Sequence, residues 1–342
     1  MSMFDIPGVS PERIINLRES AFAADLFITA VSRLNFFNRL QTEPADLDDI
    51  CQVFDIKKRP ADVMLTLFKA YGFITEKAKK FYLTDTAKTY LLQDSAFDLT
   101  SYVTSLKDRP ACADIYSVLH TGRTANWATA KDSKDWATAM EDDGFAASFT
   151  AGMNSRGAYL AAGVVKALDL KDYKKVLDIG GASGIYPAAL LNAFPHLQGT
   201  VFEKPPVDKV AKYSLKQFGM SERTTVVAGD IFKDALPKGY DVHFISHVLH
   251  DWDFPACRTI LKNSFENLKP GGIIILHDTH INKTKTGPVD VAEYSVLLMV
   301  LSEGKIYSVT EMKNLLEEAG FTSVQHKPTI LNRSIITARK AP

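Results

Sequence analysis

The chain has 342 residues, which favours two domains, and its 46% hydrophobic content is typical of globular proteins rather than disordered ones. Its 40 lysine and arginine residues equal its 40 aspartate and glutamate residues, so the net charge gives no field that would attract a nucleic acid. Three separated cysteines, no signal-peptide pattern and no apolar run of membrane-spanning length lead us to expect a cytoplasmic protein that does not contact a membrane.

Apolar residues recur at helical spacing in about the first 150 residues. Within residues 21–40, apolar residues lie at intervals of four, at Phe22, Leu26, Ala30 and Leu34, which predicts one amphipathic helix. Shorter helices are expected at 47–54 and 60–71, and they are followed by two short strands around a lysine-rich turn. Three helices and then a hairpin is the order of a winged helix, a module that often binds DNA.

The helix in the recognition position of that module runs from Arg59 to Tyr71 and has only two basic residues, Arg59 and Lys69. Its other residues are mostly apolar, as at Met64 and Phe68, so it looks like a packing surface rather than a phosphate-binding one. We therefore expect the module to contact a second copy of the chain, as in a homodimer, and not to bind DNA.

From Lys175 onward, short β-branched runs alternate with helical ones. Strands are expected at 176–179, 199–202, 224–228, 241–246 and 273–276. Helices are expected between and after them at 186–193, 207–218, 254–267 and 309–319. These repeated units predict an α/β fold with a Rossmann-like doubly wound sheet. The expected domains are a winged-helix-like domain at 1–105, a helical connector at 106–170 and the α/β domain at 171–342.

A turn of small residues follows the first of these strands. It contains, in order, Asp178, Gly180, Gly181 and Gly184. Small residues let the backbone approach a ligand closely, and the helix that follows offers free amide groups. The dinucleotide pattern GxGxxG fails because Ala182 and Ile185 stand at its second and third glycine positions, and Asp178 would repel a pyrophosphate. The expected cofactor is S-adenosylmethionine, which places a zwitterionic methionine end there instead of a phosphate.

Acidic residues also follow the next two strands. Glu203 is placed to accept hydrogen bonds from both ribose hydroxyls of this cofactor. Asp230 is placed to accept from the adenine amino group, with Ile231 and Phe232 packing on the ring. Ser246, at the end of the fourth strand, and the adjacent His247 are further candidate cofactor contacts. Three such loops at the carboxyl ends of successive strands favour one common binding site.

Six short motifs together resemble those of a known family. They are Leu-Asp-Ile-Gly-Gly at 177–181, Phe-Glu-Lys-Pro at 202–205, Gly-Asp-Ile-Phe at 229–232, His-Asp-Trp at 250–252, Leu-Lys-Pro-Gly-Gly at 268–272 and Glu-Ala-Gly-Phe at 318–321. The chain is similar over residues 20–340 to the caffeic-acid and hydroxyindole O-methyltransferases. The resemblance implies an S-adenosylmethionine-dependent O-methyltransferase that acts on a hydroxylated aromatic or similarly flat small molecule. It also implies a homodimer formed through the N-terminal winged-helix domain.

The same resemblance implies catalytic residues. The histidine of His-Asp-Trp is the general base in that family, and here it is His250. A phenol has a pKa of about 10, so a neutral imidazole that takes its proton makes it a better nucleophile. Two glutamates usually support this histidine, and the chain has Asp278 at the first position and Ile306 at the second.

Because Ile306 departs from the family pattern, other functions stay open. One alternative is a C-methyltransferase or a non-methylating enzyme on the same fold. Another, from a different class, is a cofactor-sensing regulator that binds DNA through the winged helix. The neutral overall charge and the apolar recognition helix count against the regulator.

The resemblance also gives candidate contacts to the acceptor. They are Met153, Asp251, Leu297 and Leu301. A methionine thioether packs well against a flat ring, and the two leucines predict a mostly apolar pocket. No metal is expected, because the only tempting group is His277, Asp278 and His280, and their place on one strand explains them better.

Overall fold

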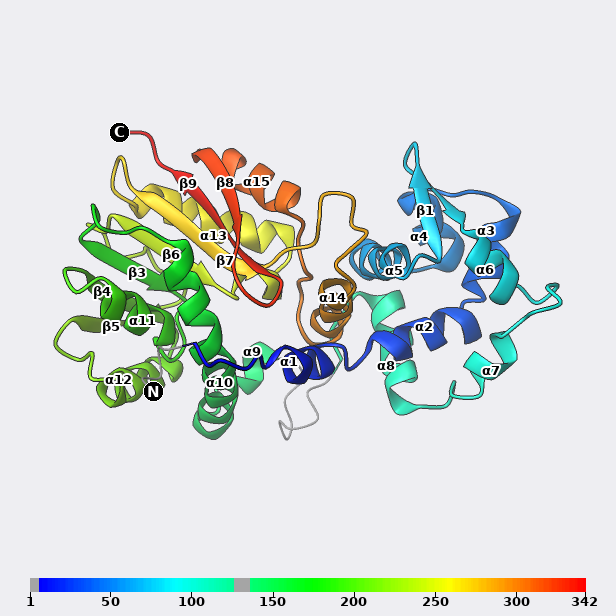
Figure 1. Cartoon of the computed structure of the whole chain (residues 1–342), viewed down its shortest axis with the longest axis horizontal. Helices are drawn as coiled ribbons and strands as arrows, with labels where there is room; N and C mark the ends of the chain where they lie inside the picture. Colours follow the sequence, from blue (N-terminus) through cyan, green and yellow to red (C-terminus); the bar gives the residue numbers. More distant parts are fainter. Residues whose placement is uncertain (1–5, 126–135) are drawn as a thin grey trace. The chain divides into compact units, whose positions relative to one another are not determined.

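The structure, a computed structural model, describes residues 6–125 and 136–342 (Figure 1). The described residues divide into two compact units, which we call the sheet unit (6–12, 136–280 and 309–342) and the helical unit (13–125 and 281–308). The boundaries expected from the sequence instead assigned residues 281–308 to the C-terminal domain. Residues 1–5 of the expected first domain and 126–135 of the expected connector lie outside the described residues.

A seven-stranded sheet forms the centre of the sheet unit. Its strand order is β5 (Thr224–Ala228), β4 (Gln198–Glu203), β3 (Lys175–Ile179), β6 (Val242–Ser246), β7 (Ile273–Thr279), β9 (Arg333–Arg339) and β8 (Thr322–Pro328). The strands from β5 to β7 run parallel, and β9 is antiparallel to both of its neighbours. The expected α/β fold class with a mostly parallel sheet is therefore confirmed.

The order of the strands reverses between β3 and β6. Strands β3, β4 and β5 follow one another outward, whereas the next strand, β6, pairs with the other side of β3. Where the connections from two adjacent parallel strands leave in opposite directions, a crevice opens at the carboxyl ends of those strands, and such crevices bind ligands in α/β proteins. The loops after β3 and β6 carry the glycine-rich turn and the His-Asp-Trp motif, so both motifs meet at this crevice.

Helices cover the sheet of this unit. They are α9 (Trp136–Ala139), α10 (Asp143–Ala167), α11 (Ile185–Ala193), α12 (Val207–Gln217), the 3-10 helix η1 (Leu249–Asp251), α13 (Phe254–Asn267) and α15 (Val309–Glu318). The four helices expected after residue 175 are present to within one residue at each end. Strands β8 and β9 were not predicted from the sequence. Nearly every residue of β8 is exposed at the edge of the sheet, so it lacks the apolar alternation by which strands are recognised.

The helical unit contains most of the N-terminal third of the chain. Its elements are α1 (Glu12–Glu19), α2 (Ala23–Ser32), α3 (Phe36–Thr42), α4 (Leu47–Phe54), α5 (Lys58–Ala70), β1 (Ile74–Lys77), β2 (Lys80–Leu83), α6 (Asp85–Tyr90), α7 (Thr100–Thr104), α8 (Pro110–Thr121) and α14 (Val289–Leu301). The prediction of one helix over 21–40 was wrong. Asn35 has a left-handed backbone with φ of 50°, which separates α2 from α3 because a right-handed helix cannot continue through it.

Helix α14 is the core element of the helical unit, and it packs against α2, α5 and α8. It was not predicted from the sequence because it is apolar on all sides, and such a helix has no amphipathic stripe. Neither α14 nor any other described helix is long and apolar enough to cross a membrane.

Arg59 joins three parts of the helical unit. One terminal nitrogen, Nη1, donates to the carbonyl oxygens of Met299, Ser302 and Gly304 at 3.1, 3.0 and 2.8 Å. The other, Nη2, donates to the carbonyl oxygen of Gly122 at 2.9 Å. The guanidinium therefore satisfies carbonyl groups at the end of α14 and just after α8, where a helix leaves them without partners.

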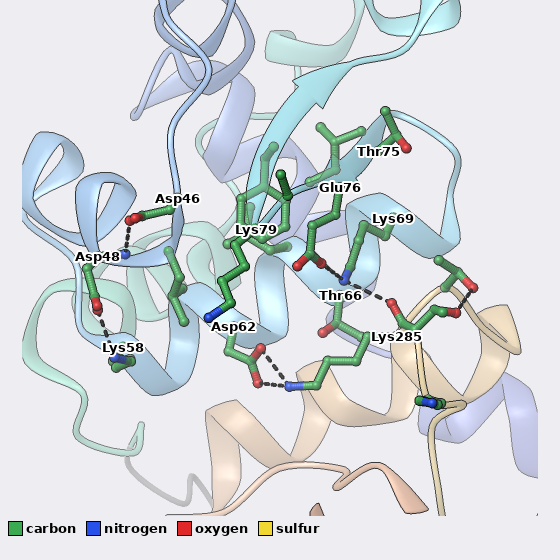
Figure 2. Close-up of a pocket in the computed structure, with 18 residues that line it drawn as sticks. Asp46, Asp48, Lys58, Asp62, Thr66, Lys69, Thr75, Glu76, Lys79 and Lys285 are labelled. Carbon is green, nitrogen blue, oxygen red and sulfur yellow. Dashed lines mark hydrogen bonds and ion pairs between the residues drawn. The ribbon is translucent and has the colours of Figure 1, made fainter. Parts of the chain in front are cut away.

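Lysines around a hollow of about 960 Å³ in the same unit are also engaged with acidic side chains (Figure 2). Lys69 Nζ donates to Glu76 Oε2 at 2.7 Å. Asp62 accepts from both Lys285 and Lys305. Burial alone would raise the pKa of Asp62, but these two ammonium groups hold it at about 2. The carboxylates of Asp62 and Glu76 therefore offset part of the positive charge around this hollow.

Candidate active site

The turn after β3 packs so closely against its surroundings, including the loop after β6, that no side chain fits at two of its positions. Gly180 has φ of +70°, and a Cβ atom there would lie 2.9 Å from Cγ2 of Val248. A Cβ atom on Gly181 would lie 2.2 Å from Oδ2 of Asp178. Both glycines are therefore required for the turn to fold around the Asp178 carboxylate at the crevice between β3 and β6.

The carboxylate of Asp178 is buried and makes no hydrogen bond with the described residues. It is only 1% exposed, and neither of its oxygens has a hydrogen-bond partner among the described residues. Burial, with a smaller contribution from the charge of Glu203, raises the pKa of Asp178 well above its usual range. A buried polar group of this kind is costly unless a ligand satisfies it, and the ligand group that fits is a cationic or hydrogen-bond-donating one.

Glu203 is held in place by two backbone amides at the end of β4. Its Oε2 accepts from the N–H of Ala182 and its Oε1 from the N–H of Lys204, each at 2.8 Å. Each oxygen keeps a lone pair for a further donor, such as a ribose hydroxyl. Burial raises the pKa of Glu203, although these two hydrogen bonds act to lower it.

Asp230 shapes the loop after β5. Its Oδ1 accepts from the N–H of Phe232 at 2.9 Å and closes a tight turn. The ring of Phe232 then meets the indole of Trp252 edge to face, with centroids 4.6 Å apart. The expected adenine-binding loop therefore contacts the His-Asp-Trp motif directly, a connection that spacing in the sequence does not reveal.

These features fit S-adenosylmethionine better than a dinucleotide. Its sulfonium and ammonium groups are cationic and it has no phosphate, whereas Asp178, Glu203 and Asp230 place carboxylates at or just beyond the carboxyl ends of β3, β4 and β5. The role of each of these residues in cofactor binding stays a prediction, as do those of Gly180 and Gly184 and of the neighbouring residues Ile231, Phe232 and Ser246.

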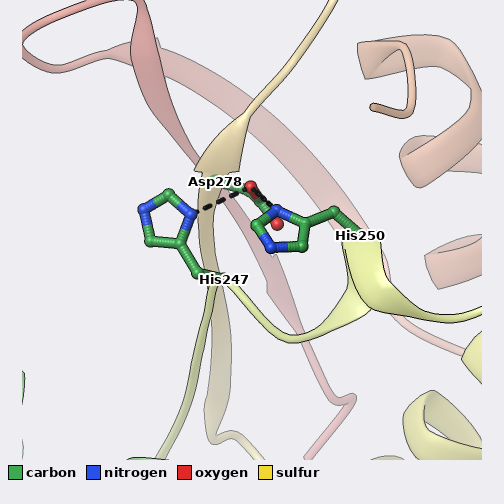
Figure 3. Close-up of side chains that lie close together, drawn as sticks. All are labelled: His247, His250 and Asp278. Atoms are coloured by element: carbon green, nitrogen blue, oxygen red, sulfur yellow. Dashed lines mark hydrogen bonds and ion pairs between the residues drawn. The ribbon is translucent and has the colours of Figure 1, made fainter. Parts of the chain in front are cut away.

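His250 lies in η1, just beyond β6, and its imidazole contacts a carboxylate at the end of β7 (Figure 3). Its Nδ1 is 2.7 Å from Oδ1 of Asp278, a distance typical of a charge-assisted hydrogen bond. The same Oδ1 accepts from the N–H of Thr279 at 2.7 Å. Burial alone would raise the pKa of Asp278, but the neighbouring histidines hold it well below its usual range, so the carboxylate is ionised. The structure thus brings together the two residues predicted to be catalytic.

His247 is a third member of this cluster, and the sequence suggested for it only a possible cofactor contact. Its Nδ1 lies 3.3 Å from Oδ1 of Asp278 (Figure 3). Burial and the nearby guanidinium of Arg156 hold the pKa of His247 well below its usual range, so the ring is neutral. Its position three residues before His250 does not predict the contact with Asp278, because His247 lies in the irregular segment between β6 and η1.

The ring nitrogens of His247 and His250 and the carboxylate of Asp278 lie within 4.8 Å of one another, a spacing at which residues of these types can hold a metal ion. This group differs from the one considered in the sequence, His277, Asp278 and His280. The 2.7 Å contact between His250 and Asp278 has the length of a charge-assisted hydrogen bond. The expectation that the protein uses no metal stays a prediction.

Asp251 lies on the other side of the His250 ring. Its Oδ1 is 3.7 Å from Nε2 of His250. Burial raises the pKa of Asp251 to about 6, while the positive charge of Arg156 acts in the opposite direction. Arg156 is a site residue that the sequence did not indicate, because it stands in the middle of α10 with no motif around it.

Helix α10 also brings Met153 near the cofactor turn. Its neighbour Asn154 accepts a hydrogen bond through Oδ1 from the hydroxyl of Ser183 at 3.0 Å, and Ser183 belongs to the glycine-rich turn. Ser246 is engaged at the end of β6, where its Oγ is 2.9 Å from Nδ1 of His277. The predicted contacts of Met153 with the acceptor and of Ser246 with the cofactor stay predictions.

Three residues named from the sequence belong to the helical unit. Leu297 is 5% exposed and Ile306 is 3% exposed, and both lie in the apolar core of that unit with Leu301 packed against it. Their burial there explains why these residues are apolar. The predicted contact of Leu297 and Leu301 with the acceptor stays a prediction.

Comparison with known proteins gives a consistent result. Residues 114–322, well over half of the chain, match the model of the O-methyltransferase domain family. The chain is 29% identical over 299 residues to the 3-hydroxy-5-methyl-1-naphthoate 3-O-methyltransferase of Streptomyces sahachiroi, which covers 87% of this chain and 86% of that protein. It is 34% identical over 203 residues to the mitomycin biosynthesis 6-O-methyltransferase of Streptomyces lavendulae, which covers 59% of this chain and 57% of that protein.

A solved structure is similar over the whole chain. It is an O-methyltransferase family 2 protein from Planctomyces limnophilus DSM 3776 in complex with apigenin, with 27% identity and a TM-score of 0.90. The similarity covers 100% of this chain and 99% of that one. Human N-acetylserotonin methyltransferase in complex with S-adenosylmethionine, at 24% identity and a TM-score of 0.63, has the same fold.

Replacing Gly181 with alanine is expected to weaken cofactor binding. The new Cβ would lie 2.2 Å from the Asp178 carboxylate, which is buried and cannot move into solvent. Overpacking of this kind costs about 1–3 kcal/mol. If the carboxylate shifts away from the cofactor by an amount that costs as much in binding, the affinity falls roughly 5- to 150-fold. Isothermal titration with S-adenosylmethionine measures the loss. The control is Gly152→Ala on α10, where no atom lies within 4 Å of the added carbon, and its affinity should equal that of the wild type.

Replacing Asp251 with asparagine is expected to stabilise the protein at neutral pH. The pKa of Asp251 is raised in the folded state, so the folded protein binds a proton here more tightly than the unfolded chain does. The resulting contribution to the free energy of unfolding is present near pH 4 and is lost as the pH rises through about 6. A rise from 3.8 to about 6 corresponds to about 3 kcal/mol. The side chain is 24% exposed, and solvent screening reduces the figure to roughly 2 kcal/mol.

Urea unfolding of both proteins between pH 4.5 and 7.5 tests this prediction. The stability of Asp251→Asn relative to the wild type should grow as the pH rises. Asp172→Asn, which removes the same charge from an exposed position, should show no such trend. A constant difference across the range would contradict the raised pKa.

Proposed function

Because the chain belongs to the O-methyltransferase family and depends on S-adenosylmethionine, we propose that it methylates a hydroxyl group of a flat aromatic small molecule, with His250 as the general base. The proposed acceptor class is supported by the naphthoate named for one relative and by the flavonoid apigenin bound to the similar structure. A half-buried Met153 next to the cofactor turn suits a flat ring.

The observation that carries the proposal is the contact between His250 and Asp278. An ionised Asp278 accepts the N–H at Nδ1 of His250, which fixes the tautomer of the neutral imidazole. Nε2 is then the nitrogen that accepts a proton, and it is the nitrogen that faces Asp251. Asp278 also stabilises the imidazolium that forms when the proton arrives.

The proposed reaction needs one proton transfer and one displacement. Bound S-adenosylmethionine supplies a methyl group activated by its sulfonium. Nε2 of His250 removes the proton from the acceptor hydroxyl as the oxygen attacks, since a phenol with a pKa of about 10 is otherwise mostly protonated. The C–O bond forms while the C–S bond breaks, and the electron pair of that bond stays on sulfur. Asp178 and Glu203 orient the donor for this in-line geometry.

Two features disfavour the alternatives raised by the sequence. Both curated relatives named above carry O-methyltransferase names, which favours oxygen over carbon as the methylated atom despite Ile306. Of the three basic residues of α5, Lys58 is exposed and pairs with Asp48. The other two, Arg59 and Lys69, bind carbonyl and carboxylate oxygens of the same chain. They are therefore not available to bind the phosphates of DNA as a regulator requires.

The partner expected from the sequence is a second copy of the chain. Several large apolar side chains of the helical unit are exposed. They are Ile14 (75%), Leu17 (66%), Phe97 (68%), Leu99 (47%), Tyr102 (80%) and Leu106 (52%). Exposed apolar residues gathered on two short segments, α1 and the region around α7, are typical of a protein interface. They support a homodimer formed through the helical unit.

Replacing His250 with alanine is expected to lower kcat for a phenolic acceptor by about a hundredfold to ten-thousandfold, the usual contribution of a general base. The affinity for S-adenosylmethionine should change little, because His250 is assigned to the acceptor. Methyl transfer to naphthols and flavonoids, followed by mass spectrometry, measures the first effect and isothermal titration the second. His196→Ala, at an exposed histidine of the same unit, is the control. Undiminished turnover by His250→Ala would show that another group is the base.

The homodimer is tested by the double substitution Tyr102→Glu and Leu106→Glu, which places two charges on the exposed apolar region. Sedimentation of the wild type at micromolar concentration should give a dimer, and the double variant should dissociate. Tyr213→Glu is the matched control because Tyr213 is 67% exposed on α12 of the sheet unit. A wild type that sediments as a monomer would overturn the proposal.

A further inference from the structure

A histidine that the proposed mechanism does not use, His247, is built into the catalytic cluster. Its side chain is only 7% exposed, and its Nδ1 lies 3.3 Å from the carboxylate oxygen that also contacts His250. Figure 3 shows the carboxylate of Asp278 between the two imidazole rings. A single buried oxygen is therefore approached by two histidines from different sides.

The backbone at His247 holds the ring in this position. Its φ is 53°, in the left-handed region that non-glycine residues rarely adopt, although histidine tolerates it better than most. The N–H of His247 donates to the carbonyl oxygen of His277 at 3.0 Å. The rings of these two residues also meet edge to face with centroids 5.1 Å apart. A strained backbone retained at a site usually has a function there.

The surroundings keep His247 uncharged. Burial and the guanidinium of Arg156 on α10 hold its pKa well below the usual range. Other titratable groups near the cluster include His277 on β7, His280 just after β7 and Asp251 on η1. Burial lowers the pKa of His277 to about 3 and that of His280 to about 4, so both are neutral near pH 7. A neutral imidazole next to an ionised carboxylate acts as a hydrogen-bond donor.

We propose that His247 is a positioning residue, which holds Asp278 in the orientation that aligns His250. The inference rests on the proposed function of His250 as the base. The contact at 3.3 Å is longer and less well aligned than the 2.7 Å contact of His250. Contacts of this kind often tighten when the reactants bind. In this arrangement a hydrogen bond from His247 partly offsets the negative charge of Asp278. The carboxylate then stabilises a protonated His250 less strongly.

Two substitutions separate this role from a purely structural one. His247→Asn keeps an N–H group at the position of Nδ1, and asparagine also tolerates the left-handed backbone. His247→Gly permits the same backbone but removes the donor. The matched control is His243→Asn, because His243 is a buried histidine of β6, the strand that leads to His247, and its Nδ1 contacts Ser264 at 2.9 Å instead of Asp278.

The expected result is a loss confined to kcat. His247→Gly should lower kcat roughly tenfold, the effect of one hydrogen bond to a charged group. The KM for the acceptor should stay within about twofold, since positioning acts on chemistry rather than on binding. The fall of kcat on the acid side of its pH profile should move to higher pH. Without the His247 ring, the carboxylate of Asp278 interacts with a single imidazole, that of His250, and favours its protonated form. His247→Asn should restore most of kcat, and His243→Asn should keep the wild-type profile.

Histidine NMR of the protein with bound S-adenosylhomocysteine gives a readout that needs no acceptor. The pKa of the His250 ring should be higher in His247→Gly than in the wild type and in His247→Asn. If the wild type methylates no phenol, the proposed function fails, and the NMR measurement still tests the contact between His247 and Asp278. An unchanged His250 titration in His247→Gly, or equal losses of kcat in the asparagine and glycine variants, would overturn the proposal.

Discussion

The close packing of Gly180 against Val248 joins the two halves of the candidate site. Gly180 belongs to the turn after β3, and Val248 lies between His247 and His250 in the loop after β6. Strand order places these loops side by side at the crevice, and the missing side chain of Gly180 lets them touch. The turn that is expected to hold the methyl donor is thereby set at a defined distance from the expected base. An in-line transfer depends on such a fixed distance, because small displacements of reacting groups cost much of the rate.

Two buried aspartates at this edge of the sheet show how partners decide the charge of a side chain. Asp178 is 1% exposed and has no hydrogen-bond partner among the described residues, and its pKa is raised. Asp278 is 7% exposed, but it contacts two imidazoles and a backbone N–H, and its pKa is lowered. Burial acts in the same direction on both carboxylates. Asp178 therefore gains most from a cationic ligand, whereas Asp278 is already satisfied as an anion and is suited to orient the base.

The sequence predicted those parts of the fold and site that depend on local patterns. The five parallel strands and the helices between them follow from runs of β-branched residues and from helical periodicity. The pairing of His250 with Asp278 followed from motif resemblance. Helix α14 was not predicted because apolar residues lie on nearly all of its sides and give no amphipathic stripe. The break at Asn35 was not predicted because a single left-handed residue leaves no periodic signal in the sequence. His247 and Arg156 depend on the approach of separate elements, which no local pattern contains.

The helical unit illustrates why the order of elements does not determine function. Helix α5 precedes a hairpin, as the recognition helix of a DNA-binding module does. Arg59, near its first turn, instead donates to four carbonyl oxygens near the ends of α14 and α8. Lys69, in its last turn, donates to Glu76. A cation that must leave such partners to reach a phosphate loses those hydrogen bonds, so binding DNA would have to offset the cost of breaking them. Arg59 and Lys69 are thus better explained by contacts that stabilise the helical unit than by binding of a nucleic acid. The third basic residue of α5, Lys58, is exposed and pairs with Asp48 at 2.7 Å.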